Sequence, residues 1–175
     1  MKSVLHVALL AAVAFVLCTS TSDAQYRHGG NWLGPVLTLA TDPIGFGAEF
    51  EHGLTPNIGI GAIVRYWGKS EGPSGYGWSW SIVMPQFQSA YHFMPGDKLD
   101  PFAGGRLGWA IYSFSSEYSA FTGGGSGGLF LTAYGGLRYF FSPAISGNGQ
   151  LEFRVAGDDY FGGSLQLSVG LDFTI

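Results

Sequence analysis

The segment Ser164–Ile175 reads SLQLSVGLDFTI, and it alternates between two kinds of residue without a break. Every second residue, from Leu165 to Ile175, is large and apolar, and the residues between them are small or polar. Successive side chains of a β-strand point to opposite faces. The segment therefore predicts a strand with one fully apolar wall and one small, polar wall.

The same alternation recurs along the chain and predicts eight strands. They cover residues 34–41, 45–53, 57–68, 77–94, 101–116, 128–141, 149–157 and 163–175. Within 77–94 the apolar parity changes: Trp78 and Ile82 share one parity, whereas Phe87 and Tyr91 share the other. Pro85 lies between them, and a bulge reverses parity by inserting one residue, so we expect a bulge near Pro85.

The composition indicates that the apolar wall faces lipid. Only 11% of the residues are charged, against about 25% in soluble domains, so neither wall carries enough charge for a solvated exterior. No apolar run after residue 24 approaches the roughly 20 residues of a membrane-spanning helix. Apolar residues spread by alternation are typical of a membrane β-barrel. The net charge of −4 gives nucleic-acid binding no electrostatic support.

The N-terminus has the pattern of a cleaved export signal. Lys2 precedes an apolar stretch, Val4–Cys18, and small residues occupy positions 22 and 24. This pattern predicts a signal peptide over 1–24 and a barrel domain over 25–175. A membrane anchor is the alternative, but the stretch is short for a span. The only cysteine, Cys18, lies in the signal, so the mature chain has no disulfide and no cysteine-based metal site.

The connections predict the orientation of the barrel. Those at 53–57, 94–100 and 142–147 are compact and are expected in the periplasm, whereas the loops at 68–76, 117–127 and 157–162 are expected outside the cell. Aromatic residues form two predicted belts at the strand ends. The outer belt comprises Tyr66, Trp67, Trp78, Trp80, Tyr112 and Phe114, and the periplasmic belt comprises Tyr91, Phe93, Phe102, Tyr139, Phe141 and Phe173.

Three segments carry a family resemblance. FEHGLTPNIGIG at 50–61, PFAGGRLGWA at 101–110 and SVGLDFTI at 168–175 resemble strands of the OmpA/OmpX/OmpW-like β-barrel superfamily of small bacterial outer-membrane proteins. The resemblance implies an all-β, eight-stranded, antiparallel up-and-down transmembrane barrel in the bacterial outer membrane. It also implies contact with outer-membrane lipid, lipopolysaccharide and the outer-membrane assembly machinery. It specifies a fold and not an activity.

Charged residues lie on the predicted inward faces, and their signs balance. They are Glu49, Glu51, Glu152 and Asp172, with Arg65, Arg106, Arg138 and Arg154. The interior of an eight-stranded barrel is only wide enough for side chains to fill, and charges in such a space need partners or water. We therefore expect an ion-pair network that fills the lumen. The alternative is a narrow gated pore.

No pattern of catalytic or metal-binding residues stands out. None of the mature histidines, His28, His52 and His92, has a serine two residues later, as a lipase dyad of this type would require. Ser126 fits a G-x-S-x-G pattern only inside a glycine tract without strand–helix context, which favours a surface loop. Asp158 and Asp159 indicate a solvated turn, and no cluster has metal-ligand spacing. We expect no enzyme activity, cofactor or metal.

The sequence thus favours an integral outer-membrane barrel with a structural or surface-interaction role and a filled lumen. Two alternatives remain open at this point. One is a narrow pore or a transporter of small apolar molecules. The other is a soluble exported lipocalin-like barrel, in which the apolar wall would face inward.

Overall fold

The computed structural model describes residues 25–39, 44–72, 77–116, 123–157 and 165–175. The predicted signal peptide (1–24) and most of the predicted 157–162 loop, with Asp158 and Asp159, lie outside the described residues. Eight strands form the fold: β1 (Asn31–Thr38), β2 (Gly45–Gly53), β3 (Ile58–Glu71), β4 (Trp78–His92), β5 (Leu99–Ser116), β6 (Gly123–Ser142), β7 (Ile145–Ala156) and β8 (Leu165–Thr174). No helix in the described part of the chain is long and apolar enough to cross a membrane.

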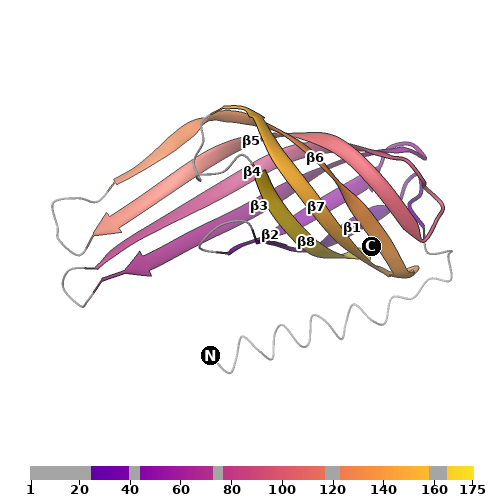
Figure 1. The fold of residues 1–175 in the computed structure, drawn as a ribbon, viewed down its shortest axis with the longest axis horizontal. Coiled ribbons are helices and arrows are strands. Elements are labelled where there is room, and N and C mark those ends of the chain that lie inside the picture. The colour runs from indigo at the N-terminus through magenta and orange to yellow at the C-terminus, as the bar shows by residue number, and fades with distance from the viewer. Residues whose placement is uncertain (1–24, 40–43, 73–76, 117–122, 158–164) are drawn as a thin grey trace, which may run out of the picture.

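The strands close into one antiparallel barrel. Each strand pairs with the next, and β1 pairs with β8 to complete the ring (Figure 1). Within the barrel body, closure gives each strand a hydrogen-bonded neighbour on both sides, which a sheet needs in a solvent that forms no hydrogen bonds.

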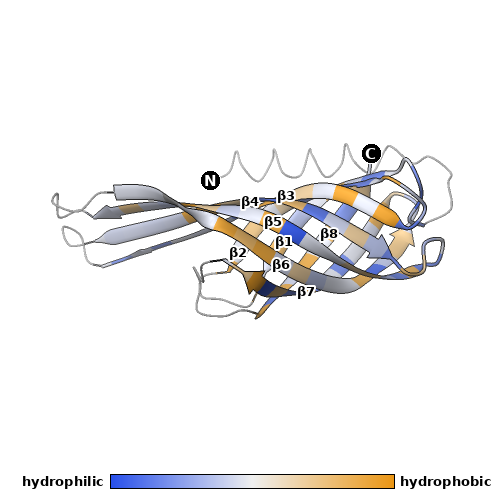
Figure 2. Cartoon of the chain, turned by 90° about the horizontal axis from the view of Figure 1, so that it is seen from above, coloured by the Kyte–Doolittle hydropathy of each residue, from blue (hydrophilic) through white to orange (hydrophobic). Residues whose placement is uncertain are grey.

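The apolar wall of each strand faces outward. In β8, Leu165 and Leu171 are 59% and 47% exposed, whereas Gln166, Ser168 and Asp172, at the alternate positions, are buried. Orange apolar residues alternate with polar ones along the strands of the barrel body in Figure 2. An exterior of this kind is stable against acyl chains and not against water. The lipocalin-like alternative, which needs the opposite arrangement, is therefore wrong.

The predicted bulge at Pro85 is absent. The pairing of β4 with β5 keeps one register on both sides of this residue, from Val83↔Ile111 to Gln86↔Gly108. Because proline has no N–H to donate, the ladder to β5 skips this position without an inserted residue. The parity of β4 is therefore continuous, and Ile82 and Met84 point into the barrel. The only register shift between β5 and β6 lies instead between Trp109 and Ile111.

Four consecutive strands are longer than the rest. β3, β4, β5 and β6 have 14, 15, 18 and 20 residues, whereas β1, β2, β7 and β8 have 8, 9, 12 and 10. The long strands run past the barrel body at the end opposite the short turns, at the left of Figure 1. We name residues 68–71, 78–81, 113–116 and 123–126 the projecting sheet.

The projecting sheet corrects two predicted loops. Residues 68–71 and 123–127 were expected in loops but belong to β3 and β6. The glycine tract pairs with β5 through its backbone, as Gly124 does with Ser113 and Gly125 with Tyr112. The hydrogen bonds of a β-ladder join backbone N–H and C=O groups, so a glycine tract forms a strand without side chains.

The faces of the sheet exchange character where the barrel body ends. Tyr66, Val83 and Ile111 form the last apolar row on the outward face. The next two outward rows consist of Gly68, Ser81 and Ser113, followed by Ser70, Ser79 and Ser115. The inward rows at the same level carry the aromatic residues Trp80, Phe114 and Trp78. The apolar exterior thus ends at the Tyr66 row, which marks the boundary of the lipid-facing wall at the end opposite the short turns.

The aromatic belts follow this continuous parity. Tyr91, Phe93, Tyr139 and Phe141 are exposed on the outside at the short-turn end, as predicted. Trp67 and Phe102, in contrast, are buried inside the barrel, so their assignment to the belts is wrong. Trp80 and Tyr112 also lie on the inward face, where they pack against buried residues.

Leu107 offers a direct test of the lipid-facing wall. It pairs with Phe87 on the outward face of the barrel body and is 50% exposed. We expect Leu107→Arg to lower the free energy of unfolding in phospholipid vesicles by about 2–4 kcal/mol, because it moves a charge into hydrocarbon. The matched variant Ser113→Arg, one row above the boundary, should cost about 0–1 kcal/mol. Equal costs for the two variants in urea titrations would contradict this boundary.

Candidate functional site

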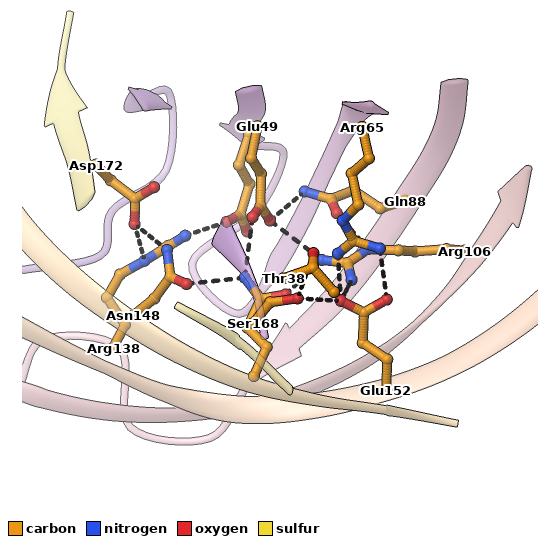
Figure 3. A network of polar contacts seen from close by, with 12 residues as sticks. Thr38, Glu49, Arg65, Gln88, Arg106, Arg138, Asn148, Glu152, Ser168 and Asp172 are labelled. Carbon is orange, nitrogen blue, oxygen red and sulfur yellow. Dashed lines mark hydrogen bonds and ion pairs between the residues drawn. The ribbon is translucent and has the colours of Figure 1, made fainter. Parts of the chain in front are cut away.

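The barrel interior holds most of the charged residues singled out in the sequence. Seven of the eight predicted side chains are buried there: Glu49, Glu51, Arg65, Arg106, Arg138, Glu152 and Asp172. The eighth, Arg154, is half-buried, and its guanidinium carbon lies 4.7 Å from the centre of the Phe130 ring. The seven buried residues form two connected groups along the lumen, and Figure 3 labels all of them except Glu51.

The first group joins two arginines to one carboxylate. Arg65 donates two hydrogen bonds to Glu152, one of them of 2.7 Å to Oε2. Arg106 reaches the same carboxylate, with its Nη1 atom 2.7 Å from Glu152 Oε1. Ser168 adds a hydrogen bond of 3.2 Å to Glu152. Two guanidinium groups therefore compensate one buried carboxylate, which such a charge requires away from water.

Glutamine side chains connect this group to Glu49. Gln88 donates to Glu49 at 2.8 Å and accepts from Arg106 at 2.8 Å. Gln150 likewise donates to Glu49 at 2.9 Å and accepts from Arg106 at 2.6 Å. Each amide uses both its donor and its acceptor, so the charge of Arg106 is shared between Glu152 and Glu49.

The second group lies nearer the short-turn end. Arg138 donates to Glu51 at 2.7 Å and to Asp172 at 3.1 Å. Asn148 donates to the same Asp172 oxygen at 2.8 Å. Asn148 also accepts from Gln150 at 3.0 Å, and this contact links the two groups.

His92 and Asp100 extend the network, and the sequence analysis did not include them. The two ring nitrogens of His92 lie 2.7 Å from a Glu51 oxygen and 2.5 Å from an Asp100 oxygen. Both residues are fully buried. Their parity was visible in the sequence, because His92 alternates in step with Gln88 and Asp100 with Arg106. Among the described residues, five buried carboxylates thus face three buried arginines and this histidine.

The residues before β1 cover the short-turn end of the network. The Tyr26 ring stacks on His92 with 3.6 Å between ring centres and on Trp32 with 4.8 Å. Gly29 donates a backbone hydrogen bond of 2.8 Å to Gly53, and this bond ties the segment to β2. Burial raises the pKa of the Tyr26 hydroxyl, and the nearby Glu51 carboxylate raises it further. Tyr26 therefore stays neutral beside the carboxylates.

The opposite end of the lumen is apolar. Trp67, Ile82, Met84, Ala110 and Phe130 form a buried cluster there, which we name the upper cluster. Gly108 makes room for it, because a Cβ atom at this position would overlap the Phe130 ring. From the short-turn end to the opposite end, the lumen therefore contains the Tyr26 and Trp32 rings, then the ion pairs, and then the upper cluster.

Within the described residues, no group of three His, Cys, Asp or Glu side chains is placed to hold a metal ion. The ionisable side chains of the lumen instead contact one another and the amides between them, as the distances above record. The arrangement binds strands together across the lumen.

No protein-family model and no curated protein matches the sequence of this chain. Solved structures do match its fold. The N-terminal β-barrel domain of Pseudomonas aeruginosa OprF has a TM-score of 0.65 at 14% identity, and the match covers 85% of this chain and 98% of that one. Neisserial surface protein A has a TM-score of 0.59 at 11% identity, and the match covers 83% of this chain and 96% of that one. Ail, the attachment invasion locus protein of Yersinia pestis, was solved with the heparin analogue sucrose octasulfate. It has a TM-score of 0.57 at 11% identity, and the match covers 83% of this chain and 97% of that one.

These similarities agree with the closed ring of β1–β8 and with its apolar exterior. The chain has the fold of the small bacterial outer-membrane β-barrels. At these identities the likeness concerns the fold, so any role must be argued from the residues of this chain.

Arg106 tests the strength of the network. We expect Arg106→Met to lower the free energy of unfolding by about 3–5 kcal/mol, because it leaves Glu152 and Glu49 buried with fewer partners. The control Arg154→Met removes a half-buried arginine that stacks on Phe130, and it should cost about 1 kcal/mol. Denaturant unfolding in vesicles measures both variants. An Arg106→Met barrel as stable as the parent would show that the network contributes nothing to stability.

Proposed function

We propose that this chain is a structural and surface-presenting barrel of the bacterial outer membrane. Its lumen is filled by the ion-pair network and does not conduct. Its role is to hold the projecting sheet above the lipid, where the sheet meets molecules outside the cell.

The filled lumen is supported by the burial and connectivity of its charges. Arg65, Arg106 and Arg138 are each at most 1% exposed. Their contacts reach from β3, β5 and β6 to strands elsewhere around the ring, as in the bond from Arg65 in β3 to Glu152 in β7. An eight-stranded barrel leaves little room beside such side chains. A non-catalytic role is consistent with the lumen, where the ionisable side chains form ion pairs and hydrogen bonds with one another.

The presenting role is supported by the strand lengths. The projecting sheet lies beyond the Tyr66 row, where the apolar exterior ends, so it extends past the lipid-facing wall. A sheet with paired strands holds its surface in one geometry, which a free loop does not. The assembly machinery and the neighbouring lipopolysaccharide are partners that this location would supply.

A second candidate is a transporter of small apolar molecules. The upper cluster favours it, because an apolar lumen end offers such molecules a suitable surface. The ion-pair network lies below this cluster in the same lumen, so transport would require the network to part. The two candidates therefore differ in whether the network opens.

Planar-bilayer recording of Arg138→Ala tests the proposal. We expect no steady conductance from the parent barrel. The variant should unfold at a lower temperature, because Glu51 and Asp172 lose their guanidinium partner, and it too should remain closed. Conductance gained by Arg138→Ala at unchanged thermal stability would contradict the filled lumen and favour a gated pathway.

A further inference from the structure

The residues before β1 cross the short-turn end of the lumen, and we name residues 25–30 the strap. Two backbone hydrogen bonds tie the strap to the last residue of β2. Gly29 donates to the Gly53 carbonyl at 2.8 Å, and Gly53 donates to the Gly30 carbonyl at 2.9 Å. Tyr26 carries the only buried side chain within the strap. The strap is therefore held by two backbone bonds and one aromatic ring.

The ring of Tyr26 lies in a closely fitted space. It is stacked on Trp32 at 4.8 Å and on His92 at 3.6 Å between ring centres. A Cβ atom on Gly59 would overlap the Glu51 carboxylate and would lie 2.9 Å from the Tyr26 hydroxyl oxygen. Glycine at position 59 thus leaves the room that the closed position of the ring requires.

The contacts of His92 show that its ring carries a positive charge. Its Nε2 atom lies 2.7 Å from a Glu51 oxygen, and its Nδ1 atom lies 2.5 Å from an Asp100 oxygen. A neutral imidazole donates a hydrogen bond from one nitrogen only, whereas an imidazolium donates from both. Because each nitrogen faces a carboxylate, the charged form of the ring matches this site.

The other ionisable groups near the ring favour the same charge. Arg138 on β6 is the neighbouring cation, and it already donates to Glu51 and to Asp172 on β8. Within the described part of the chain, five buried carboxylates face three buried arginines, so a charged His92 reduces the negative surplus. Tyr26 is neutral, and arginine keeps its proton in proteins. His92 is therefore the buried cation that a change of pH can remove.

We propose that the strap is a pH-dependent cover of the lumen, held closed by the charge of His92 and released when this ring loses its proton. An aromatic face attracts a cation that is stacked on it, so the Tyr26 ring is held more tightly by imidazolium than by imidazole. Deprotonation also leaves one of the two carboxylates without its N–H donor. Raising the pH therefore loosens the strap and admits water at the short-turn end. The device lies opposite the projecting sheet and does not depend on the presenting role.

The first test measures the charge and the strap together in phospholipid nanodiscs. NMR of the His92 ring nitrogens reports whether one or both are protonated, and hydrogen exchange of the Gly29 amide reports how often the strap opens. We expect both nitrogens to be protonated near neutral pH. His92→Gln keeps a hydrogen-bonding side chain without the charge, and it should lower the protection of the Gly29 amide roughly tenfold. The matched control His52→Gln removes a histidine that contacts Asn31, and it should leave this protection unchanged.

The second test is a titration of the parent barrel from about pH 6 to about pH 10. Corrected for intrinsic exchange rates, the protection of the Gly29 amide should fall over the interval in which His92 loses its proton. In His92→Gln the corrected protection should stay constant.

Three results would overturn the proposal. They are a neutral His92 ring near neutral pH, equal Gly29 protection in the parent and in His92→Gln, and a ring that keeps both protons wherever the protection falls or throughout the titration. The parent titration decides the matter even if His92→Gln does not fold. All of these results leave the filled lumen intact, because the conductance recordings test that separately.

Discussion

Closure of the backbone ladder between β1 and β8 is the constraint on which the rest of this structure depends. In lipid, the backbone N–H and C=O groups of an unpaired strand edge find no water to hydrogen-bond. The last strand must therefore pair with the first. Eight strands then fix a narrow interior. Side chains of one parity are dissolved in acyl chains, and those of the other must fit together in a space that admits little water. The ion-pair network is the result of that second requirement.

The sequence predicted the ring and the polar wall well because both follow from alternation. The Leu165–Ile175 row needed only the two-residue period of a strand. The wrong predictions of the bulge and of part of the aromatic belts arose because every apolar side chain was assumed to point outward. Ile82 and Met84 are apolar and inward, so the chain seemed to change phase at Pro85 when it had not. Alternation identifies two faces, but it does not reveal that the lumen itself becomes apolar near one end.

The partners inside the lumen were beyond sequence reasoning for a related reason. Parity places Arg106 and Gln150 on the inward side, but their 2.6 Å contact depends on strand tilt and on the stagger of the ring. Neither is visible in a local pattern. His92 and Asp100 show the complementary case, because their parity was legible, but Asp100 was expected in the 94–100 connection and His92 was considered only as a catalytic candidate. The projecting sheet likewise depends on tertiary pairing, which made a strand of the glycine tract.

The ion pairs also carry information about the order of assembly. Arg65 and Glu152 are 87 residues apart in sequence, as are Glu51 and Arg138. Neither pair can form within a single hairpin, so both wait until distant strands face each other across a nearly complete ring. Before that moment each inward charge needs water or the surface of another protein. The network therefore forms late and cooperatively. It stabilises the complete barrel, whereas in an incomplete barrel the inward charges lack their partners.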